Sequence, residues 1–316
     1  MESIPCRWRC ALAMALVITI SGCRRDAPAA TATTDSPLVV TEKWRAKHET
    51  DYRREWVSIA GLFALKPGSN TVGSAPTNDI VLPASTPGFV GRFVLSGHEV
   101  RFEPAPNVTP LLKDQPVSAP IVLKDDSGSG ADELTLGDVR LVVHASGEHL
   151  GLRVRDPYGP LAQDFRGFTW FPIDLSYRVT GRFLKDPESK RIKIINTVGD
   201  LDEYTTDGVV EFTLLGQTMR LRPFTTRPNR FYFVFRDASS GQETYETARF
   251  LYSDLLPDNT TVLDFNQAYN PPCAFNPYTT CPIPPRENHL PVKVLAGEKA
   301  YPVHVPLGRS GVGAGR

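Results

Sequence analysis

Most of the chain alternates hydrophobic and polar residues with a period of two, which is the pattern of β-strands buried on one face. In residues 150–154, leucine and valine alternate with glycine and arginine, and residues 177–183 alternate aromatic and branched side chains with polar ones. We therefore predict an all-β body. The predicted strands are residues 56–65, 90–95, 100–102, 139–143, 150–154, 177–183, 192–195, 209–215, 231–235 and 244–251.

One stretch near the start of this body has a helical period instead. Val40, Trp44, His48 and Tyr52 recur every four residues, and the Ser-Pro pair at residues 36–37 is typical of a helix cap and first turn. Glycine-containing turns between the later runs favour hairpins over parallel crossovers. The predicted fold class is all-β, with mainly antiparallel sandwich or barrel-like sheets, one short N-terminal helix and a long proline-rich C-terminal loop.

The composition of the chain disfavours some classes of function. The chain has 316 residues, of which 41% are hydrophobic, and 35 Lys and Arg balance 35 Asp and Glu. This balance disfavours a nucleic-acid partner. The sequence contains no phosphate-binding glycine loop, Gly-x-Ser-x-Gly elbow, His-Glu-x-x-His or Cys-x-x-Cys motif, so we predict no cofactor and no metal.

The first residues predict the location. Arg7 and Arg9 precede the apolar run 11–20, and the small residues 21–22 precede Cys23. This order resembles the bacterial lipobox, in which the cysteine is lipidated after cleavage. We predict a lipoprotein signal peptide (1–22), a lipidated tether (23–36) and a β-rich domain (37–316), with two lobes split near 104–132 as the alternative. Cys23 would anchor the protein to a membrane.

Residue 24 is arginine, and the resemblance to lipoproteins then implies a cell-envelope protein on the outer membrane, facing the periplasm.

The loop of residues 264–298 has no usable period between Leu263 and Val292, although aromatic side chains argue against disorder. An ordered loop of this length in a compact domain is usually functional. Its polar groups are candidates for a ligand site, and a purely structural reading stays open because buried loop carbonyls also need donors. With one arginine from a strand end, the candidate residues are Arg153, Asp264, Asn266, Tyr269, Asn270, Glu287, Asn288 and Glu298.

Residues 236–245 lie between two predicted strands and read as a tight hairpin in which Asp237 bonds its own turn and Gly241 has positive φ. A second reading places Asp237 and Ser239 against a ligand.

Several blocks resemble a known family. Asp264-Phe-Asn-x-Ala-Tyr-Asn-Pro-Pro-Cys-Ala-Phe, followed by Cys-Pro-Ile-Pro-Pro-x-Glu-Asn and Ala-Gly-Glu, is similar to the C-terminal signature of the bacterial and archaeal domain-of-unknown-function family 1684. Residues 56–70, 153–156, 165–172 and 237–249 resemble its other blocks in order, so the resemblance spans about residues 44–301. It implies a fold group and no activity.

Cys273 and Cys281 are the cysteines left after cleavage and lipidation. An oxidising envelope favours a disulfide between them. Two alternatives use His289: a metal site, although the spacing is not a usual zinc arrangement, and a nucleophilic cysteine.

The leading hypothesis is a membrane-anchored envelope lipoprotein that binds a small ligand or a partner at a site built by the 264–298 loop. One alternative is an envelope hydrolase that uses Asp264, Glu287 and Glu298 as acid and base. Another is a purely structural surface module.

Overall fold

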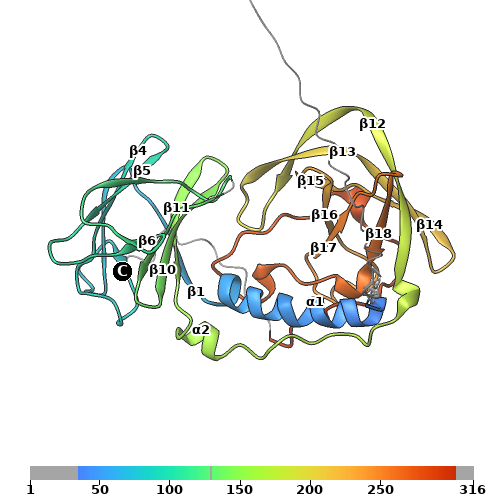
Figure 1. Ribbon diagram of the computed structural model, residues 1–316, viewed down its shortest axis with the longest axis horizontal. Helices are drawn as coiled ribbons and strands as arrows, with labels where there is room; N and C mark the ends of the chain where they lie inside the picture. The colour runs from blue at the N-terminus through green and yellow to red at the C-terminus, as the bar shows by residue number, and fades with distance from the viewer. Residues whose placement is uncertain (1–34, 129, 304–316) are drawn as a thin grey trace, which may run out of the picture. The chain divides into compact units, whose positions relative to one another are not determined.

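The computed structural model describes residues 35–128 and 130–303, so the predicted signal peptide and most of the predicted tether, including Cys23, lie outside the described residues. The described chain is mostly strand with one long helix near its start (Figure 1), which confirms the all-β prediction. Its strands form four sheets, and the pairs are antiparallel apart from the parallel pair β2–β3. None of the helices in these residues is both long and apolar enough to cross a bilayer.

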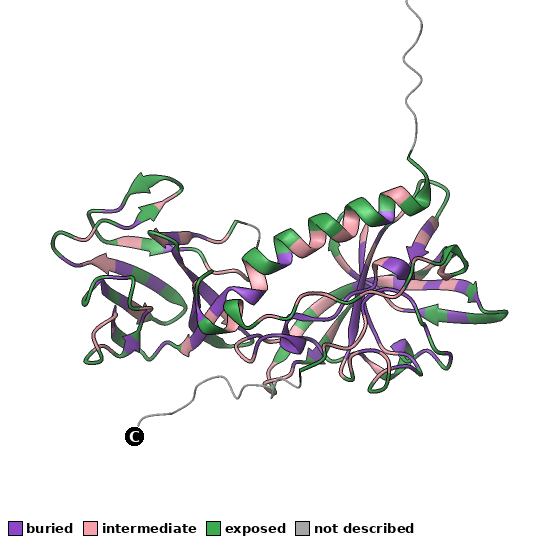
Figure 2. Cartoon of the chain, turned by 90° about the horizontal axis from the view of Figure 1, so that it is seen from below, coloured by how far each residue is buried: buried purple, intermediate pink, exposed green. Residues whose placement is uncertain are grey.

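The helix begins where the sequence pattern predicts. Ser36 accepts a hydrogen bond from a backbone N–H of the first turn and caps it. Most of α1 is exposed or half-buried (Figure 2). Thr41 and Tyr52 are buried, whereas Val40, the first residue of the four-residue repeat, is 46% exposed. Thr41 takes the inner position because its hydroxyl bonds a carboxylate beneath the helix. The helical elements are α1 (Pro37–Tyr52), the π-helical turn η1 (Arg53–Val57), α2 (Pro160–Gln163), and the 3₁₀ turns η2 (Leu175–Tyr177), η3 (Phe265–Gln267), η4 (Pro272–Ala274) and η5 (Arg286–Asn288).

Two sheets built from residues 59–155 pack face to face. The six-stranded sheet has the order β1-β11-β10-β9-β6-β7 and the five-stranded sheet the order β3-β2-β4-β5-β8. Phe93 and Phe102 from one sheet meet Leu134 and Leu152 from the other in a single buried cluster, as in a β-sandwich. The strands are β1 (Ile59–Ala64), β2 (Gly68–Gly73), β3 (Ile80–Val81), β4 (Gly91–Ser96), β5 (Glu99–Pro104), β6 (Leu111–Leu112), β7 (Gln115–Pro116), β8 (Ile121–Leu123), β9 (Glu133–Leu136), β10 (Val139–Ser146) and β11 (His149–Arg155). The predicted alternative split at 104–132 falls inside this sandwich, because that segment supplies β6, β7 and β8.

The second pair of sheets begins after β11. A four-stranded sheet has the order β14-β13-β12-β18, and a three-stranded sheet has the order β15-β16-β17. The strands are β12 (Arg178–Ile195), β13 (Leu201–Leu214), β14 (Gln217–Leu221), β15 (Phe224–Arg227), β16 (Arg230–Phe235), β17 (Arg249–Asp254) and β18 (Thr260–Asp264). Their shared core holds Phe183, Phe212 and Phe233 together with Val292 and Val294 of the terminal segment. The terminal segment is therefore part of the core.

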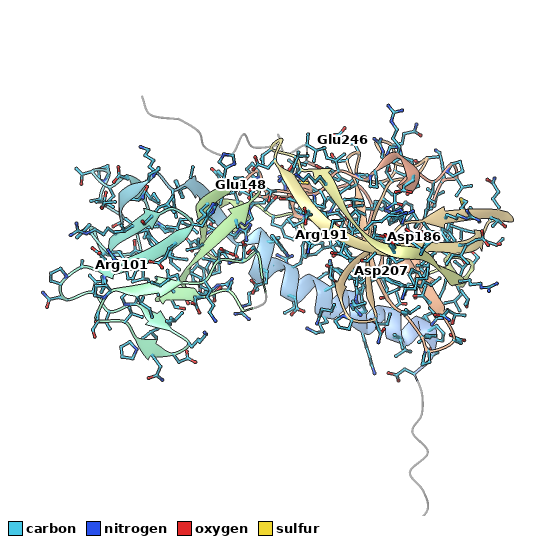
Figure 3. The ribbon with its side chains drawn as sticks, turned by 90° about the horizontal axis from the view of Figure 1, so that it is seen from above. Arg101, Glu148, Asp186, Arg191, Asp207 and Glu246 are labelled. Carbon is cyan, nitrogen blue, oxygen red and sulfur yellow. The ribbon has the colours of Figure 1, made fainter. Side chains whose placement is uncertain are left out.

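Strand β12 joins two runs that the sequence analysis keeps apart. Residues 184–191 carry polar side chains and Pro187, which hide the period of two. The pairing with β13 shifts register between Lys185 and Lys190, as expected for a bulge that accommodates proline in a strand. Figure 3 shows the charged side chains of Asp186, Arg191 and Asp207 along this hairpin.

A fully buried ion pair holds the terminal segment. The Arg249 guanidinium lies 2.9 Å from Asp237 Oδ2, and neither side chain is exposed. Arg249 also donates to the carbonyl oxygens of Val294, at 2.9 Å, and Ala296. Asp237 Oδ1 accepts hydrogen bonds from Ser239 and from the Val294 N–H. Asp237 therefore has the structural role that the hairpin interpretation predicts, and its carboxylate oxygens accept hydrogen bonds from protein groups.

We expect the substitution Asp237→Ala to lower the free energy of unfolding by about 3–5 kcal/mol, because it leaves the Arg249 charge buried and unpaired. The matched control is Arg220→Ala, which breaks an ion pair with Glu211 whose arginine is 63% exposed, and which should cost less than about 1 kcal/mol. Urea unfolding followed by circular dichroism measures both. Equal losses in the two variants would contradict the role of the buried pair.

Candidate functional site

The C-terminal segment is ordered through short 3₁₀ turns, and most of its predicted site residues bond the protein backbone. Asp264 ends β18, and its Oδ2 accepts a hydrogen bond from the Thr41 hydroxyl of α1 at 3.1 Å. Its Oδ1 accepts from the backbone N–H of Asn266 at 3.1 Å and from the side-chain amide at 3.0 Å. Arg178 Nε lies 3.5 Å from Asp264 Oδ2 on the solvent side. Asp264 therefore links α1 to the start of the loop.

Asn266 is fully buried and ties the loop to the segment before β12. Its Oδ1 accepts from the Asp174 N–H at 2.9 Å, and its Nδ2 donates to the Asp174 carbonyl at 2.8 Å. The Asn266 carbonyl accepts two hydrogen bonds from Arg45 of α1. All of these partners are protein groups, so Asn266 has a structural role.

Asn270 and Glu298 contact each other although they lie far apart in the sequence. The Asn270 backbone N–H donates to Glu298 Oε2 at 2.8 Å, and its side-chain amide donates to the Lys299 carbonyl at 2.7 Å. The Asn270 carbonyl accepts from the Tyr52 hydroxyl at 2.8 Å. Gly297 precedes this contact with φ +79°, and a Cβ there would lie 2.3 Å from the Ala268 carbonyl oxygen. Glycine is needed for the close approach.

Burial raises the pKa of Glu298 from 4.5 to about 8, and the Asn270 N–H and the nearby Arg249 oppose the rise only in part. Glu298 is therefore mostly neutral at pH 7. Burial also lowers the pKa of His48, which stacks on Trp44 in α1, to about 4.

Glu287 and Asn288 form a separate group at η5. Asn288 is fully buried and bonds the backbone of Arg222 on both sides, with Arg222 N–H to Oδ1 at 2.8 Å and Nδ2 to the Arg222 carbonyl at 2.9 Å. The half-exposed Glu287 accepts a hydrogen bond from Arg222 Nε at 2.9 Å. The two residues fasten the loop to the end of β14.

Arg153 lies in the first sandwich, away from these groups. Its guanidinium contacts Asp126 Oδ2 at 2.5 Å and His144 Nδ1 at 2.8 Å. His144 Nε2 lies 3.3 Å from the Thr280 hydroxyl of the loop. His144 and Arg153 outweigh the desolvation of Asp126 and lower its pKa to about 2. His144 therefore links Arg153 to the loop, and Arg153 also interacts electrostatically with Cys281 of the loop.

Cys273 and Cys281 are both buried free thiols, so the predicted disulfide is not present in the structure. The Cys273 N–H lies 3.3 Å from Cys281 Sγ, and the two thiols are within hydrogen-bonding contact. Burial raises the pKa of the Cys281 thiol well above its usual value, which disfavours a reactive thiolate. Among the residues that the structure describes, no cluster of His, Cys, Asp and Glu could hold a metal ion, His289 included.

One predicted residue, Asp264, lines a cleft of about 310 Å³ between α1 and strands β17 and β18, which we name the α1–β17 cleft. Its aromatic walls are Trp44 and Tyr252, and Tyr269 lies directly behind them. Tyr269 packs against Trp44 with ring centroids 6.2 Å apart and is hydrogen-bonded to Tyr252. The cleft is lined by Val40, Trp44, Arg178, Arg230, Tyr252, Ser253, Asp254, Leu256, Val262, Asp264 and Gln267.

Each arginine of the cleft has a carboxylate partner. Arg178 pairs with Asp264 at 3.5 Å, and Arg230 pairs with Asp254 at 2.8 Å. The Arg230 guanidinium also lies 5.2 Å from the centre of the Tyr252 ring, and its buried Nε has no hydrogen-bond partner among the described residues. The sequence does not mark Arg178, Arg230, Tyr252 and Asp254 as site residues, because their only local signal is their place in strands.

Comparison with known protein families gives a match in the C-terminal part of the chain. Residues 163–299 match the sequence model of a family described as protein of unknown function (DUF1684). The match supports this domain family over residues 163–299, which are less than half of the chain. The blocks at residues 56–70 and 153–156 lie outside the matched region. No curated protein matches the chain.

A solved structure is also similar in sequence. It is the solution NMR structure of an uncharacterized protein of Haloarcula marismortui, which is 31% identical over 46% of this chain and 82% of that chain, with a TM-score of 0.37.

We expect the pKa of Glu298 to make stability depend on pH. Between pH 4.5 and about 8 the unfolded chain has lost this proton while the folded chain keeps it, so the free energy of unfolding falls as the pH rises. Glu298→Gln keeps an acceptor for the Asn270 N–H and removes the titration. Urea unfolding at pH 5 and pH 8 should show a smaller loss in the variant than in the unmodified chain. Equal losses would show that Glu298 is ionised in the folded protein.

Proposed function

We propose that this protein is a lipoprotein of the bacterial cell envelope, anchored through Cys23 to the outer membrane and facing the periplasm, that binds a small ligand in the α1–β17 cleft. The observation that carries the binding proposal is the cleft itself, where Trp44 and Tyr252 face solvent beside two arginine–carboxylate pairs. Apolar walls with a few polar groups are typical of ligand sites.

The charges of the cleft indicate the kind of ligand. The two arginines and the two carboxylates that line it cancel, so the cleft favours an uncharged or zwitterionic molecule. The partly exposed guanidiniums of Arg178 and Arg230 supply donors, and the aromatic rings supply a flat apolar surface. The expected ligand is small and polar with one apolar face, as in a sugar or an aromatic amino acid.

The cleft lies close in the sequence to the proposed anchor. Val40 and Trp44, which line the cleft, lie in the first half of α1. Residues 24–36 separate Cys23 from this helix in the sequence.

The hydrolase alternative has weaker support. Asp264, Glu287 and Glu298 have separate partners, which are Thr41, Arg222 and Asn270 respectively. Among the described residues, no hydrogen bond joins any two of these three carboxylates. An acid–base pair of this kind requires two carboxylates that flank one substrate bond.

Lipidation predicts that the Cys23→Ala variant accumulates with an uncleaved leader and carries no acyl chains, because the variant has no thiol to acylate. Fractionation of bacterial cells followed by mass spectrometry of the N-terminal peptide measures both. An unmodified chain that is found free in the periplasm would contradict the anchor.

We retain the disulfide between Cys273 and Cys281 as part of this proposal, because the two thiols are neighbours and the periplasm is oxidising. Alkylation of the same purified protein without reduction distinguishes thiols from cystine by mass.

Ligand binding is tested with Val40→Glu, which places a charge on the wall of the cleft. The matched control is Leu38→Glu on the same helix, because Leu38 is 42% exposed, similar to Val40, and does not line the cleft. A soluble mature chain is screened by thermal shift and calorimetry against sugars, amino acids, and ester and glycoside substrates. We expect Val40→Glu to weaken the binding of a sugar or amino acid by about tenfold or more and Leu38→Glu to leave it unchanged.

The other outcomes distinguish the alternatives. Turnover of an ester or a glycoside would favour the hydrolase. Folded protein that binds none of the probes would favour a purely structural module, and binding that survives Val40→Glu would place the site elsewhere.

A further inference from the structure

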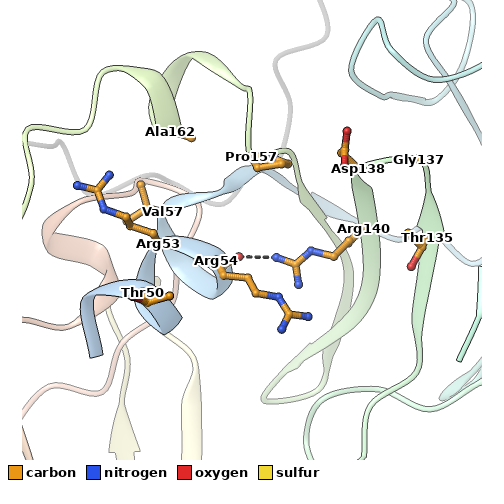
Figure 4. A pocket seen from close by; sticks show the side chains of 10 residues that line it. All are labelled: Thr50, Arg53, Arg54, Val57, Thr135, Gly137, Asp138, Arg140, Pro157 and Ala162. Atoms are coloured by element: carbon orange, nitrogen blue, oxygen red, sulfur yellow. Dashed lines mark hydrogen bonds between the residues drawn. The ribbon is translucent and has the colours of Figure 1, made fainter. Parts of the chain in front are cut away.

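A second cleft lies at the other end of α1. It has a volume of about 470 Å³ and is formed by η1, the β9–β10 hairpin and the segment that leads into α2 (Figure 4). Arg53 and Arg54 come from η1, and Arg140 comes from β10. We name it the arginine cleft. Its lining differs from that of the α1–β17 cleft because the three arginines face a single lining carboxylate, Asp138.

The guanidiniums of Arg54 and Arg140 approach each other from opposite walls (Figure 4). Arg54 Nε and Arg140 Nη1 each lie 3.4 Å from the same oxygen, Glu55 Oε1. Arg140 also contacts Glu133 at 3.0 Å and donates to the Arg54 carbonyl, which fixes its orientation. One carboxylate oxygen is therefore shared between two guanidiniums.

A third arginine, Arg155, pairs with the same two carboxylates, Glu55 and Glu133. Arg155 pairs with Glu55 at 3.5 Å and with Glu133 at 3.7 Å. Burial, followed by the positive charges of Arg153 and Arg140, lowers the pKa of Arg155 to about 10. Three guanidiniums thus share two carboxylates, and a negative ligand would relieve the repulsion.

Arg53 adds a cation without a carboxylate partner. Its guanidinium lies over the Phe165 ring at 4.7 Å from the centroid, and it makes no ion pair with another described residue. With Asp138 counted, the four arginines of the region exceed its three carboxylates by one charge. The planar fork of arginine matches the geometry of phosphate oxygens.

From this juxtaposition we infer that the arginine cleft binds the phosphate group of an organic phosphate, held between Arg54 and Arg140. The phosphate would take the donors of Arg54 that face solvent, since this side chain is 69% exposed and has one carboxylate contact at 3.4 Å. Val57, Pro157 and Ala162 supply an apolar wall for the organic part. The inference does not depend on the function proposed for the α1–β17 cleft.

The experiment titrates the soluble mature chain with glycerol 3-phosphate by calorimetry and, separately, mixes it with vesicles of phosphatidylglycerol or of phosphatidylcholine. The test variant is Arg54→Ala. The matched control is Arg191→Ala, which removes another exposed arginine that pairs with a glutamate, on the β12–β13 hairpin. We expect Arg54→Ala to weaken phosphate binding by about tenfold or more and Arg191→Ala to leave it unchanged.

A second variant separates charge from geometry. Arg140→Lys keeps the positive charge and removes the planar fork, so it should weaken phosphate binding. Because the charge is unchanged, added salt should lower the phosphate affinity of the variant and of the unmodified chain by a similar factor. Binding to phosphatidylglycerol vesicles that glycerol 3-phosphate displaces would identify a lipid headgroup as the source. Binding to glycerol 3-phosphate alone would identify a soluble phosphate ester. No binding at millimolar ligand, or equal affinities in Arg54→Ala and the unmodified chain, would overturn the inference.

Discussion

The buried ion pair between Arg249 and Asp237 is the interaction on which the C-terminal half of the domain depends. Burying a charged pair is costly unless hydrogen bonds satisfy its remaining donors and acceptors. Here the carbonyls of Val294 and Ala296 and the N–H groups of Ser239 and Val294 supply most of those partners, and the buried Arg249 Nε has none among the described residues. Because these partners lie on the terminal segment and on the 236–245 turn, the pair fixes both to β17.

The position of the terminal segment then determines the rest of the loop. With Ala296 held, Gly297 turns the chain, and Glu298 reaches the Asn270 N–H. Asn270 in turn receives the Tyr52 hydroxyl of α1. The polar residues of the family signature therefore supply hydrogen bonds to buried backbone groups that have no regular secondary structure. This role explains why so many of these residues are fully buried.

Because the polar groups of the loop bond other protein groups, the candidate ligand sites lie beside α1, the helix that the loop supports. α1 is held near its start by the contact between Thr41 and Asp264 and near its end by the contact between Tyr52 and Asn270. One cleft lies beside each half of the helix, and arginines line both. In the α1–β17 cleft each arginine has its own carboxylate, whereas in the arginine cleft Arg54 and Arg140 share Glu55 and Arg53 has no carboxylate partner among the described residues. The two clefts therefore favour ligands of different charge.

The sequence by itself determined the all-β class and where the helix begins, because side-chain period and capping are local properties. It did not predict every strand, and β2, β14 and β18 are among those it missed. Residues 231–235 lie within β16, and Ser36 caps α1 as its place before Pro37 indicates. Tertiary structure decided what each polar side chain does. Asn288 and Arg222 lie 66 residues apart, and Thr41 and Asp264 lie 223 apart, so no local pattern could pair them. Local sequence therefore marked Asp264 as a candidate site residue. Long-range packing supplies the partners that make Asp264 a structural link. It also brings the strands that carry Arg230 and Tyr252 to the same cleft.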